Sequence, residues 1–259
     1  MLHTLSIIIL IIASMIYQKP STMIIAHRGA SHDAPENTLA SVNLAWERSA
    51  DAVEVDVHLS KDNHILVIHD GDTKRTTGKK MVIRESMSPA LRSLDANNGM
   101  DQFKGERIPF LEEVIATVPN GKVLFIEVKT DTVIVPYLVE VLASSSDKSR
   151  LVVISFDFNV CAMMKKEIPA IPVYWLHYTL SGSYKDKWIK NAVDAGLDGL
   201  NFRHKGISKD YVDAVHRSGM KMFAWTVDDP VEAARLMESG IDGITSNRPA
   251  WLSEQLKAK

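Results

Sequence analysis

Two acidic residues are separated by a single valine in a segment where apolar and acidic side chains alternate. In AVEVDV, residues 52–57, every second residue is valine, and Glu54 and Asp56 occupy positions between the valines. Because successive side chains of a strand point to opposite faces, the two acidic side chains share one face. A strand with one solvated face would also alternate, but that pattern is typical of antiparallel sheets. In a parallel sheet the carboxylates are buried about 4–6 Å apart and repel by several kcal/mol, so a cation is expected between them.

A third carboxylate follows the same pattern. In LFIEVK, residues 124–129, Glu127 and Lys129 share one face with a single residue between them. Three oxygen donors, without sulfur or clustered imidazole, favour Mg²⁺ or Ca²⁺ over zinc. We therefore interpret Glu54, Asp56 and Glu127 as ligands of one divalent cation. A purely structural ion pair between Glu127 and Lys129 is the alternative.

Two histidines stand at the ends of apolar runs. His27 follows residues 23–26, and His69 stands near the end of ILVIHD. Imidazole titrates near neutrality, which suits general acid and base work. Arg28 carries a planar fork that matches phosphate oxygens. A metal, two proton carriers and the cations Arg28 and Lys129 together predict cleavage of a phosphate ester. The remaining histidines are interpreted as packed or surface residues: His3, His32, His58, His64, His177, His204 and His216.

Eight short apolar segments could position these residues. They alternate with helical stretches, and glycines at 196, 219 and 240 are placed to end three of those helices. Repeated strand–helix units over this length predict an α/β fold, a closed (β/α)₈ TIM barrel. A doubly wound open sheet would need fewer strands and a glycine-rich phosphate turn, which the sequence lacks. The eight segments are 23–26, 52–59, 123–129, 151–155, 172–176, 198–202, 222–227 and 242–246.

One stretch interrupts the alternation. Residues 71–106 are polar and hold no clean period. Long irregular connections in compact domains usually carry binding elements or lids. We predict a small inserted subdomain on the catalytic rim, within a barrel domain that spans residues 22–259.

Composition limits the function classes. The chain has 259 residues, a net charge of −2 and no stripe of lysine and arginine, so a nucleic-acid partner is not expected. Cys161 is the only cysteine, which excludes an intrachain disulfide and a thiolate zinc cluster.

The N-terminus differs from the rest of the chain. Leu5–Tyr17 is almost wholly apolar, and as a helix it would span roughly 20 Å, less than a bilayer core. No lysine or arginine precedes it, unlike a typical secretory signal. We interpret residues 1–21 as an apolar signal or membrane anchor together with its linker, and the linker is the sequence QKPST. The protein is therefore expected to be exported, periplasmic or extracellular, or to associate with a membrane through residues 5–17.

The ordered motifs resemble a known family. AHRGA, PENT, VEVDV, VIHD followed by RTTG, GERIP-LEE, IEVK and WTVDD resemble, in that order, motifs of the glycerophosphodiester phosphodiesterase family. The match extends from about residue 23 to the C-terminus. The family is a TIM barrel with an inserted subdomain, as the alternation also predicts.

The resemblance implies a role for each candidate residue. His27 and His69 would be the acid/base pair, and Glu54, Asp56 and Glu127 would bind the divalent cation. The resemblance further implies Arg28 and Lys129 as phosphate contacts, and Trp225 as a wall for the glycerol part of the substrate. Two departures, Phe110 in GERIPFLEE and the non-acidic ending ITSNRP, bear on substrate preference and are not expected to touch the chemistry.

The expected activity is metal-dependent hydrolysis of a glycerophosphodiester to sn-glycerol 3-phosphate and an alcohol such as choline. The nucleophile is either water or the neighbouring glycerol hydroxyl, the second by resemblance to phosphoinositide-specific phospholipase C. The sequence leaves open which histidine is the acid. A lysophospholipase D acting on an acylated lipid is one alternative. A catalytically inactive barrel that only binds phosphodiesters is another, disfavoured because every histidine and carboxylate is present.

Overall fold

The computed structural model describes residues 22–178, 180 and 185–257. The expected N-terminal signal or anchor, residues 1–21, lies outside the described residues. Among the helices that are described, none is long and apolar enough to cross a membrane.

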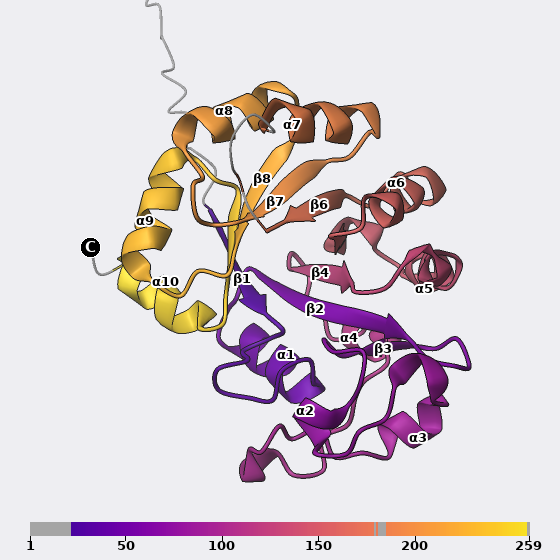
Figure 1. Ribbon diagram of the computed structural model, residues 1–259. Helices are drawn as coiled ribbons and strands as arrows, with labels where there is room; N and C mark the ends of the chain where they lie inside the picture. Colours follow the sequence, from indigo (N-terminus) through magenta and orange to yellow (C-terminus); the bar gives the residue numbers. More distant parts are fainter. Residues whose placement is uncertain (1–21, 179, 181–184, 258–259) are drawn as a thin grey trace, which may run out of the picture.

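Eight parallel strands form a closed barrel, which confirms the predicted TIM barrel (Figure 1). Each strand pairs with the next along the barrel, and β1 closes the ring by pairing with both β2 and β9. Each of the eight apolar segments of the sequence overlaps one of these strands, with ends that differ by a few residues at most. The barrel strands are β1 (Met23–His27), β2 (Ala52–Leu59), β4 (Val123–Val128), β5 (Leu151–Ser155), β6 (Val173–His177), β7 (Gly199–Arg203), β8 (Lys221–Trp225) and β9 (Gly243–Ser246).

Helices connect the strands and lie outside the barrel (Figure 1). They are α1 (Leu39–Glu47), α4 (Leu111–Ile115), α5 (Val135–Ser144), α6 (Phe158–Glu167), α7 (Lys185–Asp194), α8 (Lys209–Arg217), α9 (Pro230–Ser239) and α10 (Pro249–Lys257). Local sequence sets several of their ends. Asp229 caps the N-terminus of α9 with its side chain, and Pro230 takes the first helical position. Gly240 ends the same helix at φ 89°, a left-handed conformation that glycine adopts without strain.

The two faces of each strand enter different cores. Val53, Val55 and Val57 of β2 join the large core between strands and helices. A second cluster, inside the barrel, contains Ile25, Phe125, Tyr174 and Phe223. The polar positions of β2 and β4 lie on this interior face, so the alternation read from the sequence decides which side chains enter the barrel.

A short strand and single-turn helices follow β2. Strand β3 (Ile65–Val67) runs antiparallel to β2 and leads into α2 (Lys74–Thr77) and α3 (Ser88–Arg92), which lie beside β2 and β3 in Figure 1. A small core holds this region together: Leu66, Ile68, Ile83, Leu91, Ala96 and Ile108. The 3₁₀ turns among the described residues are η1 (Ile83–Glu85), η2 (Asp101–Phe103), η3 (Thr132–Ile134) and η4 (Lys148–Arg150).

Candidate active site

Three carboxylates meet inside the barrel near the carboxyl ends of β2 and β4. Asp56 and Glu127 are register partners on these adjacent strands. One oxygen each from Glu54, Asp56 and Glu127 lies within 4.8 Å of the others, and all three side chains are buried. The structure therefore brings the three predicted metal ligands together.

The donor set fits a divalent cation. Burial and the neighbouring carboxylates raise the pKa of Glu54 well above its usual range. Burial and the charge of Asp56 raise the pKa of Glu127 to about 7. Oε1 of Glu54 is buried and accepts no hydrogen bond from the described residues. Asp56 Oδ1 is likewise buried without a hydrogen bond from the described residues. Three crowded carboxylates, two of them with an unpaired buried oxygen, form a site for a hard cation.

Asp56 is held by two neighbours. Asn37 donates from Nδ2 to Asp56 Oδ2 at 2.8 Å, and its Oδ1 accepts from the Asp56 backbone N–H at 3.0 Å. Arg28 Nε lies 3.2 Å from the same Oδ2. Although burial opposes it, the charges of Arg28 and Lys129 lower the pKa of Asp56. Asp56 is therefore the carboxylate of the trio that is most firmly ionised.

A tight turn after β1 places Arg28. Arg28 and Gly29 both adopt left-handed backbone angles, φ 57° and 79°. The Arg28 backbone N–H donates to Glu54 Oε2 at 3.0 Å, and Ser41 Oγ donates to the Arg28 carbonyl at 2.9 Å. A Cβ at Gly29 would lie 2.5 Å from the carbonyl carbon of Ser41. Only glycine fits there, because α1 packs directly against the turn.

His27 faces an amide. Its Nδ1 lies 2.7 Å from Asn247 Oδ1. Asn247 donates to Asp228 from Nδ2 at 2.7 Å and from its backbone N–H at 2.8 Å, which fixes the orientation of the amide. Nδ1 must then carry the proton, and Nε2, 3.9 Å from Glu54 Oε2, presents a lone pair. Burial and the charge of Arg28 lower the pKa of His27, so the ring is neutral near pH 7.

His69 faces a carboxylate. Its Nδ1 lies 2.7 Å from Asp70 Oδ1. Although burial opposes it, hydrogen bonds from Arg75 and His69 lower the pKa of Asp70 to about 2, so this carboxylate is ionised. His58, interpreted from the sequence as a packed residue, is buried and its Nε2 lies 3.0 Å from the His69 carbonyl oxygen. His27 and His69 therefore differ in their partners: a neutral amide faces His27, and an ionised carboxylate faces His69.

Lys129 follows β4 and Trp225 ends β8, and the ring of Phe156 lies near both, with its centroid 5.9 Å from Lys129 Nζ and 5.5 Å from the Trp225 ring centroid. Lys129 Nζ is 2.6 Å from Glu127 Oε1 and 3.5 Å from Asp56 Oδ1, so the ion pair considered from the sequence forms within the carboxylate cluster. Trp225 ends β8 and packs edge-to-face against Phe156 and Tyr178, with ring centroids 5.5 and 5.7 Å away. Trp225 thus belongs to an aromatic cluster, while the other predicted residues gather around β1, β2 and β4.

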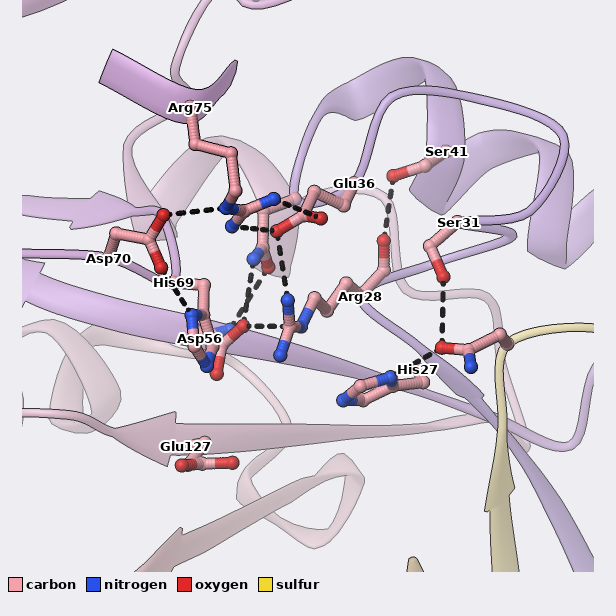
Figure 2. Close-up of polar contacts among 12 residues, drawn as sticks. His27, Arg28, Ser31, Glu36, Ser41, Asp56, His69, Asp70, Arg75 and Glu127 are labelled. Atoms are coloured by element: carbon pink, nitrogen blue, oxygen red, sulfur yellow. Dashed lines mark hydrogen bonds and ion pairs between the residues drawn. The ribbon is translucent and has the colours of Figure 1, made fainter. Parts of the chain in front are cut away.

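Sequence reasoning missed several members of this site. It noted PENT and RTTG as motifs but assigned no role to Glu36, Asn37 or Arg75. Glu36 and Arg75 hydrogen-bond within the network of Figure 2, and Asn37 donates to Asp56. It also held that ITSNRP does not touch the chemistry, which was wrong because Asn247 contacts His27. Phe110, the other departure, packs under Arg92 with 4.1 Å from the guanidinium carbon to the ring centroid.

Comparison with known proteins places the chain among phosphodiesterases. A family model described as the glycerophosphoryl diester phosphodiesterase family matches residues 27–251. The glycerophosphodiester phosphodiesterase of Caldanaerobacter subterraneus is 32% identical over 237 residues, covering 89% of this chain and 96% of that protein.

Solved structures of phosphodiesterases are also similar to this chain. An Oleispira antarctica phosphodiesterase, in complex with the product sn-glycerol-3-phosphate, is similar with a TM-score of 0.83 and 27% identity, covering 92% of this chain and 97% of that one. A glycerophosphodiester phosphodiesterase from Parabacteroides distasonis is similar with a TM-score of 0.79 and 27% identity, covering 93% and 99%.

Proposed function

The chain belongs to the glycerophosphoryl diester phosphodiesterase family, and from this premise we propose that it hydrolyses glycerophosphodiesters to sn-glycerol 3-phosphate and an alcohol. The observation that carries the proposal is the meeting of His27, His69 and the three-carboxylate cluster at the carboxyl ends of the barrel strands. In TIM barrels, catalytic residues come from this end of several different strands. The Oleispira structure in complex with sn-glycerol-3-phosphate supports the same product here.

The cations of the site would bind the phosphate. Arg28 offers a planar fork at the end of β1, and Lys129 offers an ammonium group after β4. A divalent cation bound by Glu54, Asp56 and Glu127 would supply further charge stabilisation at the phosphate oxygens. Oxygen donors alone favour Mg²⁺ or Ca²⁺.

The partners of the two histidines favour one division of labour. His27 is neutral, its Nδ1 proton is directed at Asn247, and its Nε2 lone pair can accept a proton from the nucleophile. His69 Nδ1 lies against the ionised carboxylate of Asp70, whereas the partner of His27 is a neutral amide. We therefore assign His27 as the general base and His69 as the general acid that protonates the leaving alkoxide.

Both nucleophiles considered from the sequence are compatible with this assignment. If the neighbouring glycerol hydroxyl attacks, a cyclic glycerol phosphate forms first and water opens it in a second step. Phosphorus NMR of the reaction distinguishes the two routes, because only the first shows a cyclic phosphate signal that rises and then falls.

A direct assay tests the function. Purified protein is incubated with glycerophosphocholine or lysophosphatidylcholine, in excess EDTA and then with added Mg²⁺ or Ca²⁺. We expect sn-glycerol 3-phosphate and choline from glycerophosphocholine with a divalent cation, and no turnover in EDTA. Exclusive cleavage of lysophosphatidylcholine would instead establish a lysophospholipase D. No cleavage of either substrate under any metal condition would support an inactive, phosphodiester-binding barrel.

We further propose that residues 1–21 serve export or membrane anchoring, as the apolar composition of residues 5–17 suggests. The barrel strands begin at Met23, so the residues assigned to the site follow this segment. Fractionation of cells that express the full chain tests the location. Recovery of the activity only from the cytosol would contradict it.

A further inference from the structure

Arg75 makes a three-pronged contact at the rim of the active site (Figure 2). It lies on α2, the first helical turn after His69. Its Nε donates to Asp70 Oδ2 at 2.7 Å, Nη1 to Glu36 Oε2 at 2.8 Å, and Nη2 to Glu36 Oε1 at 2.7 Å. One guanidinium therefore ties together carboxylates from two separate loops.

Each carboxylate in turn holds a residue of the proposed chemistry. Asp70 accepts Arg75 on Oδ2, while its Oδ1 lies 2.7 Å from His69 Nδ1. Glu36 accepts Arg75 on both oxygens, and Arg28 Nη1 also donates to its Oε1 at 3.0 Å. The dashed lines of Figure 2 run without interruption from His69 to Arg28 through Arg75.

Opposite charges hold Arg75 against Asp70 and Glu36. Although burial opposes it, Arg75 and Arg28 lower the pKa of Glu36, and Asp70 is likewise ionised. The positive charge of Arg75 is thus already shared by two anions, and three of its five N–H groups point at them. An anionic substrate would gain little by contacting Arg75 directly, so its role is to hold Asp70 and Glu36.

Arg75 contributes little to the stability of the fold by comparison. Its side chain is 43% exposed, and α2 comprises only four residues. Exposed ion pairs stabilise proteins by small amounts, because water screens them. A bidentate fork nevertheless fixes geometry strongly.

We propose that Arg75 is a positioning residue that sets the orientation of His69 through Asp70 and of Arg28 through Glu36. The proposal rests on the proposed function, since it concerns the same site. The region after β3 would then do more than border the site, because its first helix holds the acid and the phosphate-binding arginine in register.

A double-mutant cycle tests this role. The Arg75→Met variant keeps the apolar stem and loses the fork, and kcat is measured on glycerophosphocholine in the wild-type and His69→Ala backgrounds. In the wild-type background we expect kcat to fall about 10–100-fold, by analogy with the loss when hydrogen-bond partners that orient metal ligands are removed. In the His69→Ala background the loss should be much smaller, because one of the two groups that Arg75 positions is gone.

Two further variants separate the effect of Arg75 on His69, through Asp70, from its effect on Arg28, through Glu36. Asp70→Ala should lower kcat, because it removes the oxygen that contacts His69 Nδ1. Glu36→Ala should chiefly raise KM, because it removes the acceptor that holds Arg28 Nη1 and leaves Arg28 only its contact with Asp56. Arg75→Lys, which keeps the charge without the fork, should fall between wild type and Arg75→Met, and it serves if the methionine variant does not fold.

Arg92→Met is the matched control. Arg92 lies in the same region and also makes a two-pronged pair, with Glu113 at 2.5 and 2.9 Å, and its hydrogen-bond and cation–π partners among residues 22–178, 180 and 185–257 include none assigned to the site. Arg92→Met should lower kcat by the same small factor in the wild-type and His69→Ala backgrounds. If Arg75→Met also costs the same factor in both backgrounds, Arg75 does not act through His69 and the proposal is wrong. An inactive wild-type protein would instead refute the proposed function itself.

Discussion

Replacing Glu127 by glutamine should change how stability depends on pH in the metal-free protein. Glu127 is 8% exposed, and burial and the charge of Asp56 raise its pKa from 4.5 to about 7. A carboxyl group whose pKa is raised on folding stabilises the folded state while it is protonated. That contribution is fully present below about pH 4.5 and is lost as the pH rises through about 7.

The size of the effect follows from the two pKa values. At about 1.4 kcal/mol per pH unit, raising the pH from 5 to 8 should remove about 2–3 kcal/mol of this contribution. For a domain of this size that corresponds to about 4–12 °C in Tm. The glutamine variant carries no titrating group at this position, so residue 127 contributes no change in its unfolding free energy between pH 5 and 8.

The measured quantity is the difference in unfolding free energy between wild type and Glu127→Gln, in EDTA, from pH 5 to 8. The difference is needed because burial lowers the pKa of His27, His58 and His177. Those histidines make the protein more stable as pH rises toward 6.5, in the opposite direction, and their contribution is common to both proteins. Denaturant titration at each pH gives both free energies.

The sign of the slope decides between two interpretations of Glu127. We expect the stability of wild type relative to the variant to fall as pH rises. If Glu127 served only as the ion-pair partner of Lys129, its pKa would be lowered and the relative stability would not fall over this range. A flat or rising difference would therefore refute the carboxylate-cluster interpretation. Saturating Mg²⁺ or Ca²⁺ should stabilise wild type and not the variant, by about 2.7 kcal/mol at 100 times Kd.

Three shorter predictions concern other parts of the chain. His27→Ala and His69→Ala should each lower kcat on glycerophosphocholine at least about 10²-fold, and His216→Ala should not. On the p-nitrophenyl ester of glycerol phosphate, whose leaving group departs unprotonated, only the His69 variant should recover, and recovery of the His27 variant instead would reverse the acid/base assignment. Gly29→Ala should lower Tm and abolish turnover, because φ is 79° and the new Cβ would lie 2.5 Å from a backbone carbon of α1; an unchanged Tm in a thermal melt would contradict this. A chain that begins at Ser21 should fold and match the full chain in kcat/KM, and a loss of folding seen by circular dichroism would make the N-terminal run part of the fold.

Several features of the fold and site could be predicted from local sequence alone. Alternation in AVEVDV and LFIEVK places Glu54, Asp56 and Glu127 on the face that proves to be the barrel interior. This works because side-chain direction in a strand has a period of two and needs no tertiary information. Glycines after helices and short apolar runs likewise mark the ends of elements, because backbone conformation at those positions depends mainly on the residue itself.

Other features required the closed barrel. His27 and Asn247 are 220 residues apart in the chain, and only the pairing of β1 with β9 brings the amide against the imidazole. Arg75 on α2 and Glu36 in the loop after β1 are 39 residues apart, and only the tertiary fold brings them together. Hydrogen bonds between side chains act over about 3 Å, so they depend on strand register and loop path, which no local pattern encodes. The sequence alone therefore determined which residues enter the barrel, and the tertiary structure decided which partner each residue faces. The proposed division of the two histidines into base and acid rests on those partners.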